Sequence, residues 1–162
     1  MPASGDPAIW EEAAPDDRVR LAVRLPAGSR GTFNHRHPNQ IERLEVLSGR
    51  LLVSLGRQTH RLRTGDVIVI PAGMPHWVRN DGSEEVCAVC ELEPALGGRG
   101  MLEALFGLRR RTSNTLEKLS FLQLAVLLYE FRHEIRLAGP LVPHPLIDFV
   151  GATAKLLGLG GV

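Results

Sequence analysis

Residues 35–49 read HRHPNQIERLEVLSG, and residues 65–80 read GDVIVIPAGMPHWVRN. The first stretch holds two histidines one residue apart, a glutamate and a closing glycine. The second holds a Pro-x-Gly turn, a third histidine and an asparagine. Imidazole and carboxylate groups bind divalent transition metals. The spacing therefore predicts a metal pocket supplied by two strand-like segments.

Strand periodicity supports this prediction, because side chains on a strand alternate between its two faces. His35 and His37 then share one face. We expect Asn39-Gln40 to form a turn and the chain to return antiparallel, so that Glu42 faces the same pocket. Gly49 would then close a hairpin to the next strand.

The same alternation sorts the neighbouring residues. We expect Arg36, Arg43, Glu45 and Trp77 to point away from the pocket, with Trp77 packing on the outer face. Five mostly apolar side chains are candidates to line a substrate pocket next to the metal: Phe33, Leu44, Val46, Met74 and Val78.

Length and composition allow one domain with a core, or a domain with an appendage. The chain has 162 residues, 44% of them apolar, and a net charge of +1, which argues against a nucleic-acid partner. The start of the sequence is polar, and the longest apolar stretch, around Phe121–Leu128, is shorter than the roughly 20 residues of a membrane span. We expect a soluble cytoplasmic protein.

Short strands separated by turn residues fill residues 18–93 and predict a sandwich or barrel. The expected strands are Val19–Leu25, Glu42–Leu47, Leu51–Leu55, Thr59–Leu62, Val67–Ile70, His76–Arg79 and Val86–Leu92.

The pattern turns helical after Pro94. We expect a linker at Leu96–Gly100 and helices at Met101–Arg111, at Leu119–Leu137 with Ser120 as N-cap, and at Pro145–Leu157 with Gly158 ending it. The predicted organisation is an N-terminal extension (1–17), a β-barrel (18–97) and a helical C-terminal extension (98–162).

Other metal-binding or redox candidates are weaker. Cys87 and Cys90 form a C-x-x-C, which could be a redox pair or half of a zinc site. They fall on an expected strand, where positions i and i+3 face opposite sides, so we interpret them as structural. We expect His60 to be exposed and His133 to be a surface residue, and His144 also lies outside both motifs.

The two motifs resemble the paired motifs of the cupin superfamily. The second matches Gly-x5-Pro-x-Gly-x2-His-x3-Asn at every specified position, and the first matches His-x-His-x4-Glu-x6-Gly. The first departs at its start, where Ser29 stands in place of a glycine six residues before His35. The resemblance covers about residues 18–93 and is strongest to small single-barrel bacterial members with a helical C-terminal extension.

This resemblance implies a mainly β fold, the cupin-type double-stranded β-helix (jelly-roll barrel), followed here by C-terminal α-helices. It also implies one divalent transition metal (Fe, Mn, Ni, Zn or Cu), with His35, His37, Glu42 and His76 as its ligands. Such a set leaves coordination positions open for water or substrate.

Two functions follow as hypotheses. The first is a metal-dependent enzyme for a small molecule, dioxygenase-like or isomerase-like, in which Glu42 could leave the metal and act as a base. The apolar neighbours favour an apolar or aromatic ligand over a sugar phosphate. The second is a non-catalytic small-ligand or metal-binding and sensing module that acts through its helical tail.

The apolar face of the Leu119–Leu137 helix must be buried on the chain's own barrel, on a second copy or on a partner. We expect docking on the barrel or a homodimer. Binding of the last helix to a membrane surface is disfavoured, because Lys155 is its only cation.

Overall fold

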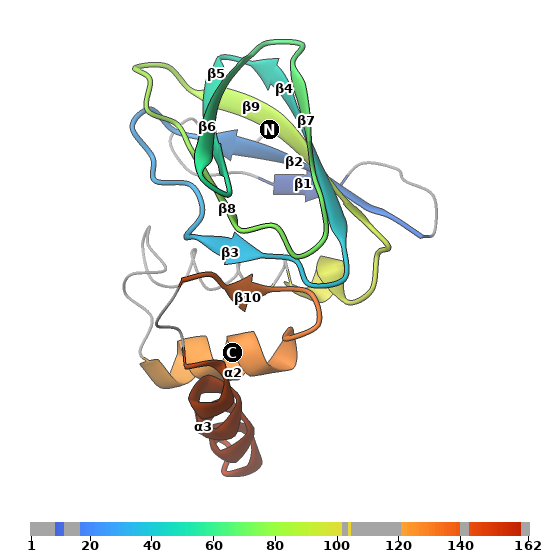
Figure 1. The fold of residues 1–162 in the computed structure, drawn as a ribbon, viewed down its shortest axis with the longest axis vertical. Helices are drawn as coiled ribbons and strands as arrows, with labels where there is room; N and C mark the ends of the chain where they lie inside the picture. The colour runs from blue at the N-terminus through green and yellow to red at the C-terminus, as the bar shows by residue number, and fades with distance from the viewer. Residues whose placement is uncertain (1–8, 12–16, 102–103, 105–120, 140–142, 160–162) are drawn as a thin grey trace.

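The computed structural model describes residues 9–11, 17–101, 104, 121–139 and 143–159. Its strands form two five-stranded sheets, and its helices lie at one end of them (Figure 1). The strands are β1 (Ile9–Glu11), β2 (Val19–Leu25), β3 (His35–Arg36), β4 (Ile41–Ser48), β5 (Arg50–Leu55), β6 (Gln58–Arg63), β7 (Val67–Ile70), β8 (His76–Arg79), β9 (Val86–Glu93) and β10 (Arg136–Leu137). Two helices follow in the C-terminal part, α2 (Phe121–Glu130) and α3 (His144–Leu156).

The strand order is β1-β2-β9-β4-β7 in the first sheet and β10-β3-β8-β5-β6 in the second. Every strand pairing in both sheets is antiparallel. This confirms the predicted mainly β barrel with C-terminal helices. The seven strands expected from the sequence all form, with ends within one residue of the predicted ones.

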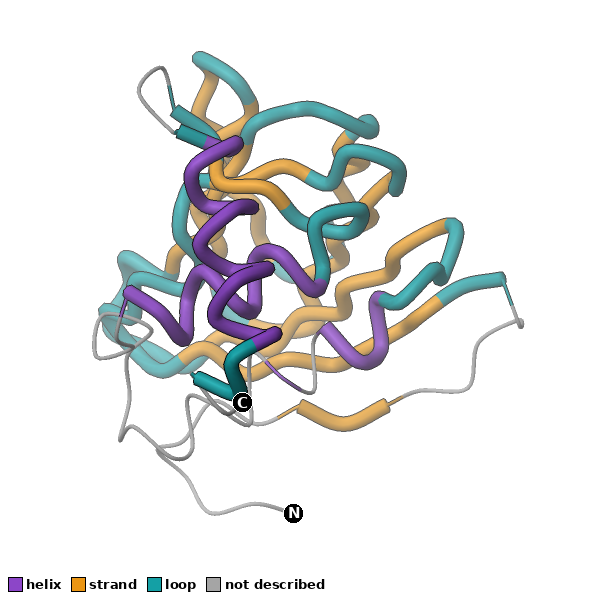
Figure 2. Tube along the Cα trace, turned by 90° about the horizontal axis from the view of Figure 1, so that it is seen from below, coloured by secondary structure: helices purple, strands orange, loops and turns teal. Residues whose placement is uncertain are grey.

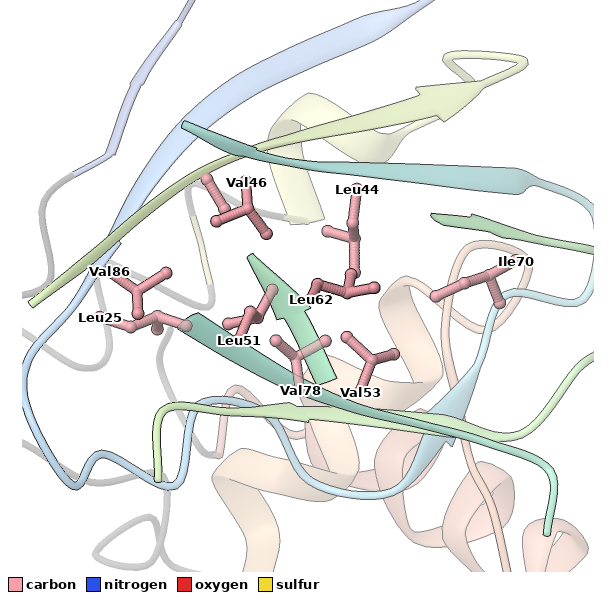
Figure 3. Packing of buried hydrophobic residues seen from close by; sticks show 10 residues of the cluster. Leu25, Leu44, Val46, Leu51, Val53, Leu62, Ile70, Val78 and Val86 are labelled. Atoms are coloured by element: carbon pink, nitrogen blue, oxygen red, sulfur yellow. The ribbon is translucent and has the colours of Figure 1, made fainter. Parts of the chain in front are cut away.

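The barrel core lies between the two sheets (Figure 3). Leu44 and Val46 of β4 enter it from the first sheet, and Leu51 and Val53 of β5 enter it from the second. All four are at most 3% exposed. Burial of one such side chain stabilises the fold by about 1.5–3 kcal/mol. Buried residues alternate with more exposed ones along β4, so Glu42 lies on the same inward face as Leu44 and Val46.

The hairpins predicted around the first motif are wrong. β3 and β4 lie in different sheets, and so do β4 and β5, so the chain crosses the barrel at the turns after His37 and at Gly49. Gly49 has φ +85°, and a Cβ there would lie 2.9 Å from the Glu85 carbonyl oxygen. Turn residues mark where a strand ends, but barrel closure decides which strand it pairs with.

The C-terminal extension (98–162) contributes a strand to the second sheet. Instead of one helix over Leu119–Leu137, α2 ends at Glu130, residues 131–134 turn, and β10 pairs with β3. The predicted linker is also wrong in part, because residues 98–101 are helical. The apolar spacing after Glu130 fits a helix, but β3 offers a strand edge, and pairing with it satisfies backbone groups there. Residues 102–103 and 105–120, including Ser120, lie outside the described residues.

The extension packs on the chain's own barrel, as one of the alternatives predicted. Leu127 and Leu128 of α2 join Ile147 of α3 and Leu92 of β9 in a second buried cluster. Figure 2, seen from below, shows the purple helices in front of the strands. Among the described residues, no helix is long and apolar enough to cross a membrane.

The last helix agrees with its prediction within one residue at each end. Gly158 ends it with φ +66°, and the exposed Lys155 forms an ion pair with Glu130 of α2. Ile147 faces the cluster, whereas several apolar side chains of this part of the chain stay exposed: Leu146, Phe149, Leu156 and Leu157.

Candidate metal centre

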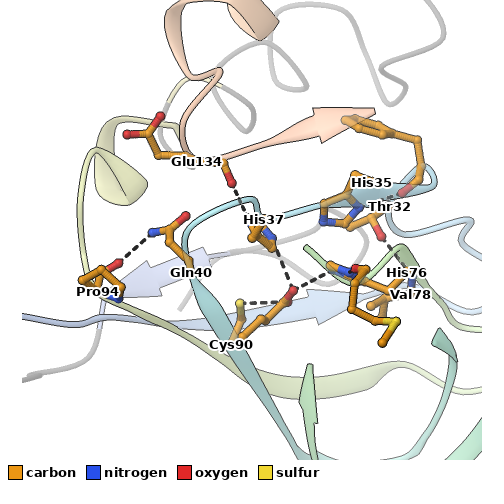
Figure 4. Close-up of polar contacts among 12 residues, drawn as sticks. Thr32, His35, His37, Gln40, His76, Val78, Cys90, Pro94 and Glu134 are labelled. Carbon is orange, nitrogen blue, oxygen red and sulfur yellow. Dashed lines mark hydrogen bonds and ion pairs between the residues drawn. The ribbon is translucent and has the colours of Figure 1, made fainter. Parts of the chain in front are cut away.

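Three imidazoles and one carboxylate converge inside the barrel, near the end that the helices cover (Figure 4). His35 of β3 lies directly opposite His76 of β8 in the second sheet, and His37 follows β3. Glu42 reaches them from β4 of the first sheet. All four residues are buried, and one ligand atom from each lies within 4.8 Å of the others. The structure therefore brings together the four predicted ligands.

Backbone carbonyls orient all three imidazoles. The Nδ1 atom of His35 lies 2.8 Å from the Phe33 oxygen, and that of His76 lies 2.9 Å from the Met74 oxygen. The Nδ1 atom of His37 lies 2.6 Å from the Glu134 oxygen. A carbonyl oxygen only accepts, so each Nδ1 carries the proton and donates it. In the neutral ring, Nε2 then presents a lone pair, which is the form that binds metals.

The Glu42 carboxylate lies close to the Nε2 atoms of His37 and His76. Its Oε2 lies 2.7 Å from His76 Nε2 and 3.3 Å from His37 Nε2. His76 Nε2 and Glu42 Oε2 are buried, and among the described residues no group outside the cluster satisfies them. Two acceptor atoms at this distance repel unless a proton or a cation joins them. The donor set and its unsatisfied atoms therefore fit a divalent transition metal.

The pKa values of His35 and Glu42 are both shifted away from their usual range. Burial, together with the charges of His76 and His37, lowers the pKa of His35 from 6.5 to about 3, so this ring is neutral near pH 7. Burial alone would raise the pKa of Glu42, but the neighbouring His37 and His76 rings outweigh it and hold that pKa well below its usual range. Burial alone would lower the pKa of His76, but the hydrogen bond and charge of Glu42 raise it, so a proton or a cation between these two groups is favoured. The centre thus offers a neutral imidazole and a carboxylate, the protonation states required of ligands.

Cys90 also belongs to this centre, although sequence reasoning set it aside. Its thiol lies 3.2 Å from Glu42 Oε1 and donates a hydrogen bond to it. Burial and the Glu42 charge raise the pKa of Cys90 well above its usual value, so the thiol keeps its proton. Strand parity could have found this residue, because Cys90 alternates in step with the buried Val86, Ala88 and Leu92 of β9.

A cavity of about 110 Å³ adjoins the metal candidates, and it is mostly apolar. Of the five predicted lining residues, Phe33, Leu44 and Val78 do line it. Val46 instead packs in the barrel core, and Met74 packs against that core. The unpredicted lining residues include Leu21 and Val23 of β2, Cys90, Leu92, and Met101 and Ile135 of the extension; Arg24 and Thr32 add polar groups.

The other motif positions, Asn80 and Gly73, shape the loops rather than the centre. Asn80 is 1% exposed, and its side-chain nitrogen donates to the backbone oxygens of Leu25, Pro26 and Glu84. The N–H of Gly73, at φ +77°, donates to the His37 oxygen at 2.7 Å. These contacts hold the histidine-bearing loops against their neighbours.

The remaining histidines and outward residues lie away from the centre. His133 is exposed as expected, whereas His60 is half-buried rather than exposed, and His144 is half-buried on α3. The Arg79 guanidinium stacks over the Trp77 ring at 4.3 Å from its centroid. The two cysteines are free, and only Cys90 reaches the candidate metal ligands.

Comparison with known proteins identifies the class that this fold and centre define. Residues 21–91 match the protein-family model described as Cupin domain. These residues therefore form a cupin domain, as the two motifs predicted.

Individual relatives match part of the chain. The chain is 42% identical over 74 residues to "Polyketide synthase CurC" of Streptomyces cyaneus, covering 46% of this chain and 47% of that protein. It is 35% identical over 72 residues to "11S globulin seed storage protein 2" of Sesamum indicum, covering 43% of this chain and 16% of that protein. The chain thus spans less than half the length of these curated relatives.

A solved structure supports the fold. An uncharacterized protein with a double-stranded beta-helix domain from Klebsiella pneumoniae superposes with a TM-score of 0.51 at 24% identity. The match covers 59% of this chain and 84% of the other, and it bears on the fold alone.

Proposed function

We propose that this protein is a metal-dependent enzyme of the cupin superfamily, dioxygenase-like or isomerase-like, that acts on a small molecule. One divalent transition metal, Fe, Mn, Ni, Zn or Cu, would be held by His35, His37, Glu42 and His76. One observation carries the proposal: three imidazoles and one carboxylate converge in a buried cluster, with one ligand atom from each within 4.8 Å of the others.

The cavity supports an apolar ligand with an oxygen-bearing end. Its walls include Leu21, Phe33 and Ile135, and its polar groups gather at the candidate metal ligands, with Arg24 and Thr32 elsewhere. A relative that is 42% identical over 74 residues is named a polyketide synthase. By this likeness we propose an aromatic or polyketide-type molecule with adjacent oxygen atoms as the ligand.

Each residue of the centre has a role in this proposal. A bound divalent metal polarises a ligand oxygen and, if it is redox-active, activates dioxygen. The three imidazoles would hold it through Nε2, and the Cys90 thiol donates a hydrogen bond to Glu42 Oε1, which leaves Oε2 for the centre. The apolar walls exclude water from the reacting end of the ligand. The low pKa of Glu42 makes it a carboxylate ligand first, and its role as a base stays a prediction.

A second candidate is the non-catalytic binding or sensing module. The observation that favours it is the contact between His37 and the Glu134 carbonyl, which joins the centre to the helical extension. Ligand binding and turnover distinguish the two candidates. A homodimer and a cytoplasmic location stay predictions.

Turnover tests the enzyme directly. Protein loaded anaerobically with Fe²⁺ is mixed with oxygen and a panel of catechols, flavonols and diketones, and oxygen uptake and product NMR spectra are recorded. We expect uptake or isomerisation with at least one compound, and a loss of about 100-fold or more in the His76→Ala variant, because a ligand is missing. Tight binding of a panel compound without uptake or conversion would instead support the sensing module.

A further inference from the structure

One short segment of the extension, residues 133–138, holds the loop that carries the first two histidines. We call it the clamp segment. The side chain of Asn39 donates to the His133 oxygen at 3.0 Å, and that of Asn34 donates to the Ala138 oxygen at 3.1 Å. The N–H of Ala138 donates back to the Asn34 oxygen at 2.9 Å, and β10 pairs with β3 between these contacts. The clamp segment therefore spans the loop from Asn34 to Asn39.

Glu134 is the point at which the clamp segment touches a metal-ligand candidate. Its carbonyl oxygen accepts the proton of His37 Nδ1 at 2.6 Å, in a buried contact (Figure 4). The other two imidazoles are held by carbonyls two residues before them in their own loops. His37 alone among the three depends on a residue 97 positions away in the sequence.

The side chain of Glu134 is anchored as well. It is 8% exposed, and its Oε1 accepts the N–H of Gly97 at 3.1 Å. A Cβ on Gly97 would lie 2.9 Å from this oxygen, so glycine permits the close approach. A buried carboxylate is costly unless hydrogen bonds satisfy it, so this contact fixes where residue 134 sits. Glu134 is thus held at its side chain by Gly97 and at its main chain by His37.

We propose that Glu134 is a positioning residue that holds the His37 imidazole with Nδ1 protonated and Nε2 facing the centre. The proposal rests on the proposed metal centre for its effect on metal affinity. It gives the C-terminal extension a defined role. Gly97 fixes the side chain of Glu134, and the main chain of the same residue fixes the orientation of His37, a candidate metal ligand. A carboxylate that only stabilised the fold would contribute to unfolding free energy without affecting the ring of His37.

The experiment compares Glu134→Ala, Glu134→Gln and the control Glu130→Gln. The glutamine keeps an oxygen that can accept from Gly97, whereas alanine removes it. Glu130 pairs with the exposed Lys155, so its variant removes a carboxylate nearby without reaching the centre. Zn²⁺ affinity is measured by chelator competition on folded protein. The His37 ring is followed by ¹H–¹⁵N NMR of the metal-free protein.

We expect Glu134→Ala to bind Zn²⁺ about 10- to 100-fold more weakly, the usual effect of losing a residue that orients a ligand. Glu134→Gln should restore most of the affinity, and Glu130→Gln should match the wild type. In the metal-free wild type, a slowly exchanging Nδ1 proton of His37 should be present, and in Glu134→Ala it should be lost.

Two results would overturn the proposal. One is a Glu134→Ala protein that keeps both the wild-type Zn²⁺ affinity and the His37 Nδ1 signal. The other is a Glu134→Gln protein that loses as much affinity as alanine. A wild type that binds no Zn²⁺, Fe²⁺ or Mn²⁺ would refute the proposed function instead, and the NMR signal of the metal-free variants would then decide the positioning role alone.

Discussion

Cys90 and Glu42 show how single contacts set the chemistry of the centre. The Cys90 thiol donates a hydrogen bond to Oε1 of the carboxylate, and Oε2 is directed toward His37 and His76. Glu42 is therefore prepared to bind a metal through one oxygen. The protonated thiol takes no part in coordination in this arrangement, because only a thiolate is a good ligand.

The two cysteines should differ in reactivity. Burial and the nearby Glu42 charge raise the pKa of Cys90 well above its usual value, and each unit of increase lowers the thiolate fraction tenfold. We expect iodoacetamide at pH 8 to label Cys90 at least about tenfold more slowly than Cys87, as measured by peptide mass spectrometry. The control is Cys87→Ser, which keeps Cys90 as its single cysteine. In the folded state this variant should remain almost unlabelled. Equal labelling of both cysteines would contradict the buried contact with Glu42.

The four metal-ligand candidates could be identified from the sequence because their spacing is local and strand parity is regular. The carbonyl partners of His35 and His76 are also local, two residues before each ring. The partner of His37 could not be predicted, since it comes from Glu134 in a segment that helical periodicity assigned to a helix. The cavity lining was predicted only for residues beside the motifs.

Among the elements, α2 and α3 cross at unusually close range. Gly151 of α3 is buried, and a Cβ there would lie 2.3 Å from the Ala125 oxygen and 2.5 Å from the Tyr129 Cβ. Glycine in a helix costs about 1 kcal/mol relative to alanine, so the close crossing opposes local helix propensity. The crossing places Ile147 in the cluster that covers the barrel end.

Gly151→Ala should therefore destabilise the protein despite its better helix propensity. We expect the free energy of unfolding to fall by about 1–3 kcal/mol, the usual cost of overpacking, in urea titrations. Ala152→Gly, at the neighbouring half-buried position, measures the propensity effect alone and should cost about 1 kcal/mol. A Gly151→Ala protein more stable than the wild type would show that the helices cross at a greater distance.

Strands were the elements that sequence predicted best, since alternation and turn residues are both local. Pairing was predicted less well: β3 and β4 looked like a hairpin but belong to opposite sheets. β10 was missed entirely, because two residues are too few to show a period and their strand exists only by pairing with β3. Tertiary pairing there overrides the helical spacing of the apolar residues.

At the scale of the molecule, barrel and extension share one centre. Met101 and Ile135 line the same cavity as Phe33 and Leu44, and Glu134 holds His37. The extension therefore contributes to the walls of this cavity. The change of composition after Pro94 marks a change of secondary structure. It does not divide the cavity, because residues on both sides of Pro94 line it.

The central claim is that the four side chains hold one divalent metal. The most direct measurement is the metal content of protein purified without added metal, determined by inductively coupled plasma mass spectrometry for the wild type and His76→Ala. The account predicts close to one transition-metal ion per chain in the wild type and a strong loss in the variant, with both proteins folded. Wild-type protein without a bound transition metal, even after incubation with Fe²⁺, Mn²⁺, Ni²⁺, Zn²⁺ and Cu²⁺ in turn, would contradict it.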